Sequence, residues 1–189
     1  KERVVDKMNK EIKNKKLTGY PSIDKPWLKY YSDEAIYSPL PKMTMYQYIY
    51  ENNKEHLNDI ALIYYGTKIT YGELFDNVEK TARAFYSLGL RNNDVVIVCS
   101  VNMPETVYAL YALNRLGVVV NLVDPRTDEK TLRMYINECK AKIVLTVDLA
   151  YQIIKKAIRK SSAEKIIVVS PSNSLSFVMK LFIELKIKQ

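Results

Sequence analysis

The fold is decided by the stretch from Asp94 to Val123, which reads DVVIVCSVNMPETVYALYALNRLGVVVNLV. It opens with Val95 to Cys99, an apolar run of strand length without polar alternation. Such a run is typical of a strand covered on both faces. Val118 to Val123 repeats the pattern and is predicted as a second buried strand. The stretch is therefore a strand, a connection and another strand.

The connection between these strands has the signals of a helix. Asn102 is predicted to cap its start, Pro104 lies in the first turn, where its missing amide hydrogen does no harm, and Glu105 completes a capping box. Gly117 is predicted to end it in the left-handed conformation.

The same unit repeats towards the C-terminus. Asp124 to Thr127 forms a turn, and the predicted elements that follow are a helix with its apolar face between 132 and 139, a strand at 143–147, a helix at 149–159 and a strand at 166–169. Strands and helices that alternate at these lengths imply right-handed crossovers. The predicted fold class is α/β, a doubly wound, mostly parallel sheet with helices on both faces.

The region before the sheet begins with an arm rich in tyrosine and proline, and its segment from Tyr20 to Trp27 is predicted to be extended. Thr44 and Gln47 form a capping box for a helix reaching about Glu55. A hairpin is then predicted at 61–71, with Gly66 in its turn, followed by a helix with apolar residues at 74, 78, 82 and 85 that ends at Gly89.

These patterns divide the 189 residues into three parts. Residues 1–58 are the N-terminal arm and helix, residues 59–170 are the α/β body, and residues 171–189 are an amphipathic tail helix. The chain opens with Lys1 rather than Met, which suggests a trimmed piece of a longer protein.

The net charge of +8 is located at the two ends of the chain. Residues 1–16 carry seven basic and three acidic side chains, residues 155–189 carry eight and two, and residues 17–154 carry fourteen and sixteen. Because the body is almost neutral, nucleic-acid binding is not expected. With no signal peptide and no apolar run long enough to span a membrane, a cytoplasmic protein is expected.

The sequence lacks the residues that several common catalytic and binding sites require. Cys99 and Cys139 are 40 residues apart and lie in apolar segments, which excludes a disulfide scaffold and a cysteine-based zinc site. The five glycines match neither a dinucleotide fingerprint nor a P-loop. His56 is interpreted as a solvated residue at a helix end. We therefore expect no catalytic, cofactor-binding or metal-binding residues in this chain.

Motifs in the body resemble the AMP-forming adenylate ligases, a superfamily that includes acyl-CoA synthetases. Ile69-Thr70-Tyr71-Gly72-Glu73-Leu74 resembles the first core motif of that superfamily, and the segment from Leu113 to Arg126 resembles the second. Asp94-Val95-Val96 and Asn102-Met103-Pro104-Glu105 lie between them at a spacing like the family's. The resemblance spans roughly residues 20 to 170 and covers only the N-terminal portion of such an enzyme.

The resemblance implies the two-step chemistry of these ligases. A carboxylic acid and ATP give an acyl-adenylate and pyrophosphate, and a thiol such as CoA then forms the thioester; ATP, Mg²⁺ and CoA are the implied cofactors. The family's Ser/Thr/Gly-rich loop ending in Pro-Lys-Gly and its catalytic lysine are missing from this sequence. The fragment is therefore expected to be inactive and to bind none of these cofactors.

Two alternatives stay open at this point. One is an amino-acid adenylation domain that loads a carrier protein, and the other is a non-catalytic α/β binding module. For the ligase fragment, we expect a small-molecule carboxylic acid as the substrate of the parent enzyme. We also expect a homo-oligomer formed through exposed apolar surface, since large apolar patches promote association.

Overall fold

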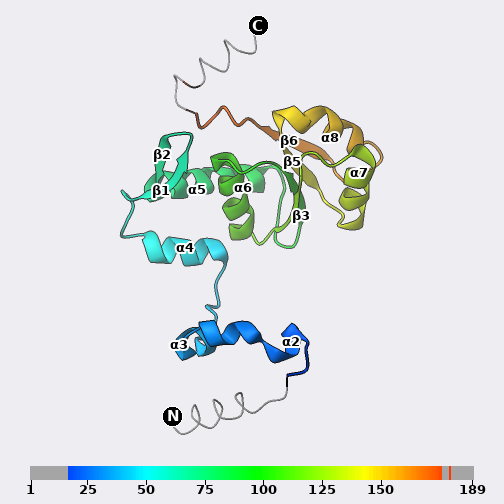
Figure 1. The fold of residues 1–189 in the computed structure, drawn as a ribbon. Helices are drawn as coiled ribbons and strands as arrows, with labels where there is room; N and C mark the ends of the chain where they lie inside the picture. The colour runs from blue at the N-terminus through cyan, green and yellow to red at the C-terminus, as the bar shows by residue number, and fades with distance from the viewer. Residues whose placement is uncertain (1–16, 176–178, 180–189) are drawn as a thin grey trace. The chain divides into compact units, whose positions relative to one another are not determined.

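A four-stranded parallel sheet with the strand order β4, β3, β5, β6 organises residues 43–175. Figure 1 labels β3, β5 and β6 of this sheet. Its strands are β3 (Val95–Cys99), β4 (Val119–Val123), β5 (Ile143–Val147) and β6 (Lys165–Val169). The structure, a computed structural model, describes residues 17–175 and 179. The predicted fold class, a doubly wound α/β sheet, is confirmed.

Helices cover both faces of the sheet and enclose two separate cores. They are α5 (Tyr71–Ser87), α6 (Pro104–Arg115), α7 (Glu129–Glu138) and α8 (Tyr151–Ala157). Successive side chains of a strand point to opposite faces. Val96 and Val98 accordingly pack with α5 and α6, whereas Ile97 and Cys99 pack with α7 and α8.

Position in the sheet decides how well each strand is buried. All five residues of β5 are buried, as predicted for a strand covered on both faces. The prediction of a buried strand at 118–123 is wrong for most of its length, because β4 lies at the edge of the sheet. Val119 and Leu122 are 53% and 63% exposed.

The segment before the sheet contains α4 (Met45–Asn53), β1 (Ile60–Tyr64) and β2 (Thr67–Thr70). The strands form the predicted hairpin, with Gly66 in the left-handed conformation at its turn. The capping box of Thr44 and Gln47 is confirmed, and a second box joins Thr70 and Glu73 at the start of α5. Tyr46 of α4 lies in the core with α5 and α6.

Two helix boundaries differ from the prediction, and a third predicted helix is not tested. Asn102 does not cap α6; Met103 is the N-cap, because Pro104 occupies the first helical position. The helix predicted at 149–159 is a short 3₁₀ turn, η2 (Asp148–Ala150), followed by α8. The predicted tail helix at 171–189 lies mostly outside the described residues.

Residues 1–42 form a separate unit, and residues 43–189 form the other. Three short helical segments follow one another in the first unit: α2 (Pro21–Asp24), η1 (Pro26–Tyr30) and α3 (Asp33–Tyr37). The prediction of an extended segment at 20–27 is therefore wrong. Proline at a first helical position has a φ suited to a helix, and here Pro21 and Pro26 both begin helical turns.

Candidate functional site

The sheet has one topological switch point, between β3 and β5. From β3 the chain passes through α6 to β4, and from β4 it crosses back through α7 to β5, on the other side of β3. Helices α6 and α7 therefore lie on opposite faces. In open α/β sheets, ligands bind outside the carboxyl ends of the strands at such a point. This edge is the candidate site.

The loop after β3 is fixed to the first turn of α6 by hydroxyl groups. Thr106 Oγ1 donates to the carbonyl of Val101 at 2.8 Å and lies 2.7 Å from Ser100 Oγ. A threonine hydroxyl has one hydrogen, so Ser100 is the donor in the second bond. Because Thr106 is buried, these bonds hold the backbone of the loop in one conformation.

The loops after β5 and β6 are joined by a carboxylate. Asp148 Oδ2 accepts from Ser170 Oγ at 2.6 Å, and its Oδ1 accepts from the amide of Leu149 at 2.7 Å. The hydroxyl of Ser172 lies 3.0 Å from that of Ser170. This edge of the sheet therefore presents a carboxylate and two hydroxyls, all within one hydrogen-bonded group.

The end of β4 supplies a second carboxylate, which is already paired. Three hydrogen bonds from the Arg126 guanidinium and one from its backbone amide hold Asp124, and they lower the pKa of that carboxyl to about 2. Cys99 Sγ lies 3.7 Å from the Asp124 carbonyl oxygen. Burial raises the pKa of the Cys99 thiol to about 11, so it stays protonated and is a poor nucleophile near neutral pH.

These residues do not fit a magnesium site. Among the residues that the structure describes, no three His, Cys, Asp or Glu side chains come together in a way that would hold a metal ion. Asp124 and Asp148 follow different strands, β4 and β5, which are not neighbours in the sheet. The edge therefore offers hydroxyl groups and a backbone that hydrogen bonds hold in one conformation. We assign no catalytic step to it.

The residues singled out in the sequence, Gly72, Gly117 and His56, lie at or near the ends of helices. The amide of Gly72 donates to the Leu57 carbonyl at 2.9 Å, at the start of α5. Gly117 has a φ of +70°, and a Cβ there would lie 2.1 Å from Asn92 Oδ1, so a larger residue would be strained and would displace the Asn92 side chain. His56 is exposed, with Nδ1 3.2 Å from Asp59 Oδ2.

Sequence reasoning missed the group at the carboxyl edge. Its signal is present, because Ser100, Asp148 and Ser170 each directly follow a predicted strand. What the sequence does not show is that β5 and β6 are neighbours, which brings Asp148 and Ser170 together.

The fold and this edge define a parallel α/β protein with a ligand position at its switch point. The family model of the AMP-binding enzymes matches residues 49–184. The chain belongs to the AMP-binding enzyme family.

Relatives in this family are acyl-CoA and acetyl-CoA ligases. The long-chain-fatty-acid–CoA ligase of Bacillus subtilis is 26% identical over 166 residues, which cover 87% of this chain and 30% of that protein. The acetyl-coenzyme A synthetase of Mycolicibacterium smegmatis is 36% identical over 104 residues, covering 55% of this chain and 11% of that protein. This chain therefore spans less than a third of either relative.

Solved structures share the fold. A long-chain-fatty-acid–CoA ligase from Archaeoglobus fulgidus superposes with a TM-score of 0.65 at 21% identity, over 69% of this chain and 28% of that one. A benzoate CoA ligase from Burkholderia xenovorans gives the same score at 19% identity, over 68% and 26%. Within the part of this chain that the structure describes, no helix is long and apolar enough to cross a membrane.

Proposed function

We propose that this chain is part of an ATP-dependent, AMP-forming acid–thiol ligase of the acyl-CoA synthetase type, acting in the cytoplasm on a small carboxylic acid. In the first step a carboxylate oxygen attacks the α-phosphorus of ATP and pyrophosphate leaves. In the second, the thiol of CoA loses its proton and attacks the acyl carbon of the adenylate, and AMP leaves. Mg²⁺ bound to the phosphates would neutralise their charge.

The observation that carries this proposal is the family match over residues 49–184, which includes the whole parallel sheet and its carboxyl edge. The names of the relatives, long-chain-fatty-acid–CoA ligase and acetyl-coenzyme A synthetase, favour an acyl substrate and CoA as the thiol.

We further propose that the chain alone does not catalyse adenylation. The hydroxyls at its carboxyl edge are bonded to their own neighbours, and the carboxylate of Asp148 repels polyphosphate. The buried thiol of Cys99 is protonated near neutral pH. In this account the chain shapes one wall of the site, and the groups that bind and activate ATP come from the part of the ligase that this chain does not span.

Two assays test the two parts of the proposal. Pyrophosphate exchange into ATP, measured on the 189-residue chain with acetate or palmitate, is expected to stay at background, with the Bacillus subtilis ligase as the active control. Exchange catalysed by the chain would contradict its inactivity.

The ligase assignment is tested by a chimera. This chain replaces the matching segment of the Bacillus subtilis ligase, and folding is checked by a cooperative thermal transition. A folded chimera is expected to retain measurable exchange. A folded chimera with no exchange would contradict the assignment.

A further inference from the structure

A cavity of about 610 Å³ lies open between α4, α5 and the C-terminal end of α6. Tyr46 and Phe75, which are 7% and 5% exposed, form its inner wall. The rest of its lining is polar or aromatic and comes from Thr44, Gln47, Tyr50, Asp76, Glu79 and Arg115. We call this cavity the α4–α5 pocket. It shares no residue with the carboxyl edge of the sheet.

The α4–α5 pocket holds one cation of the chain itself against a ring and a carboxylate. Arg115 Nε donates to Glu79 Oε1 at 2.6 Å, and the guanidinium lies over the Tyr46 ring, 5.8 Å from its centre. The Tyr46 hydroxyl donates to the same carboxylate oxygen at 3.2 Å. Because the face of an aromatic ring and a carboxylate both attract positive charge, this arrangement favours a cation.

A second ring and a second carboxylate lie next to the first pair. Tyr50 is one turn beyond Tyr46 on α4, and Asp76 is one turn before Glu79 on α5. The Tyr50 ring lies 5.0 Å from the ring of Phe75, the residue next to Asp76. Tyr50 and Asp76 therefore belong to the same part of the pocket.

No basic side chain of the chain serves this second pair. Among the residues that the structure describes, none forms an ion pair with Asp76 or lies over the Tyr50 ring. Both side chains are accessible, since Tyr50 is 40% exposed and Asp76 is exposed as well. Two carboxylates and one arginine line the pocket, so its net charge is negative.

We propose that the α4–α5 pocket binds an organic cation, whose alkylammonium head group packs on the Tyr50 ring and pairs with Asp76. An aromatic face suits a bulky, weakly hydrated cation of this kind. Mg²⁺ and Ca²⁺ need about six oxygen ligands, which two carboxylates and a ring do not supply. The head group can belong to a free amine or to a lysine side chain of another protein. This inference does not depend on the proposed ligase activity.

Binding of choline to the 189-residue chain, followed by the NMR signal of the choline methyl protons, tests the site. The control ligand is its uncharged isostere, in which a tert-butyl group replaces the trimethylammonium group. We expect saturable choline binding with the upfield shift that the face of a ring produces, and about threefold weaker binding of the isostere. Equal binding of the two ligands, or no choline shift at concentrations up to about 50 mM, would overturn the proposal.

Two variants locate the bound cation. Tyr50→Leu removes the ring and Asp76→Asn removes the charge, and each is expected to weaken choline binding about threefold. Tyr48→Leu on α4 and Glu138→Gln at the end of α7 are the matched controls, because both residues are exposed and neither lines the pocket. A cooperative thermal transition checks the folding of each variant. Controls that weaken binding as much as the pocket variants would overturn the proposal.

A second pair of ligands separates the two sources of the head group. Acetyl-lysine methylamide, acetylated at its α-amino group, carries the ammonium of butylamine together with two peptide groups. Tighter binding of the lysine derivative than of butylamine would support the site with a protein lysine as its ligand, and equal affinity would support it with a free amine. If both fail to bind and choline also fails, the proposal is overturned.

Discussion

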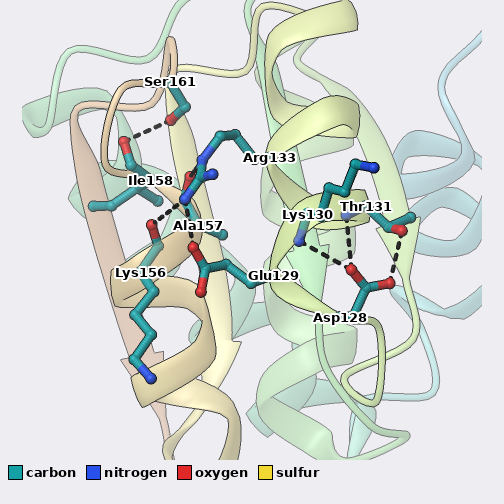
Figure 2. A network of polar contacts seen from close by, with 9 residues as sticks. All are labelled: Asp128, Glu129, Lys130, Thr131, Arg133, Lys156, Ala157, Ile158 and Ser161. Carbon is teal, nitrogen blue, oxygen red and sulfur yellow. Dashed lines mark hydrogen bonds and ion pairs between the residues drawn. The ribbon is translucent and has the colours of Figure 1, made fainter.

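The two faces of the sheet are completed to different degrees. On the α7–α8 face, Ile136 and Ile154 are fully buried, and the two helices are tied together by one arginine (Figure 2). Arg133 Nη2 donates to the Lys156 carbonyl at 3.0 Å and contacts Glu129, and its Nε donates to the Ala157 carbonyl at 3.3 Å. On the other face, an apolar groove of about 350 Å³, lined by Leu88, Tyr108 and Ile167 among others, stays open beside β6.

The difference follows from where polar groups meet their partners. Arg133 donates to the carbonyls of Lys156 and Ala157 at the C-terminal end of α8, and the Lys156 carbonyl also accepts from the Arg159 amide at 3.3 Å. On the α5–α6 face, Glu105 Oε2 is shielded from solvent and has no hydrogen-bond partner among the described residues. The α7–α8 face is thus closed by packing and hydrogen bonds, whereas the α5–α6 face keeps an open groove with an unpaired carboxylate oxygen beside it.

The largest expected loss of stability comes from truncating buried side chains on the α7–α8 face. Ile136→Ala removes methylene groups from a fully buried position and should lower the free energy of unfolding by about 3 kcal/mol. The matched change on the open face is Ile167→Ala, at a half-buried position lining the groove, with an expected loss of about 1 kcal/mol. Urea unfolding measures both, and equal losses would contradict the comparison.

Removing the arginine that ties α7 to α8 should have the next largest effect. Arg133→Ala leaves the carbonyls of Lys156 and Ala157 without this donor and should cost about 2 kcal/mol. Arg133→Lys should recover only part, because an ammonium lacks the planar fork of a guanidinium. Arg126→Ala is the control, since this arginine is 88% exposed, and a loss under about 0.5 kcal/mol is expected. If the two alanine variants are equally stable, the Arg133 contacts drawn in Figure 2 do not stabilise the fold.

Removing the capping box at the start of α5 tests how much this box stabilises the helix beside the open groove. Thr70 Oγ1 accepts from the Glu73 amide at 3.2 Å, and Glu73 Oε2 accepts from the Thr70 amide at 2.8 Å. Thr70→Ala should lower the free energy of unfolding by about 1 kcal/mol, and Thr70→Ser should be close to the native value. A Thr70→Ala variant that unfolds at the native urea midpoint would show that the cap does not stabilise α5.

The smallest expected effect is a pH dependence at the amino end of the sheet. Lys142 Nζ lies 2.7 Å from Asp94 Oδ1, and its hydrogen bond lowers the pKa of that carboxyl. Because the pKa is lower in the folded state, the stabilisation is present above the unfolded pKa of about 3.9 and is lost as the pH falls through the folded value.

Asp94→Asn should therefore cost about 0.5 kcal/mol at pH 7 and progressively less below about pH 4. Urea midpoints measured between pH 2 and pH 7 give this difference for the native chain and the variant. A difference that does not change with pH would rule out the ion pair as its source.

The sequence predicted the elements better than their surroundings. Apolar runs located β3 and β5, and the Thr-x-x-Gln and Thr-x-x-Glu patterns mark the starts of α4 and α5, because these signals are local. The exposure of β4 was not predictable from its composition, since an edge strand and a central strand can share one apolar pattern and only the strand order separates them.

The sequence prediction fell short at two places near the site, for different reasons. Asn102 was the better capping residue by type, but Pro104 at the first helical position puts the cap one residue later, at Met103. The bond between Asp148 and Ser170 joins loops 22 residues apart. It depends on the pairing of β5 with β6, which no spacing along the chain reveals.

In the function proposed above, this chain shapes a ligase site whose ATP-binding groups lie elsewhere. Titration of Mg·ATP into the 189-residue chain, by calorimetry and by the shift in Tm, tests it most directly. A ligand that binds only the folded state raises the Tm as its concentration passes Kd. We expect no saturable heat and no rise in Tm at about 1 mM nucleotide. Saturable binding with a rise in Tm would contradict it.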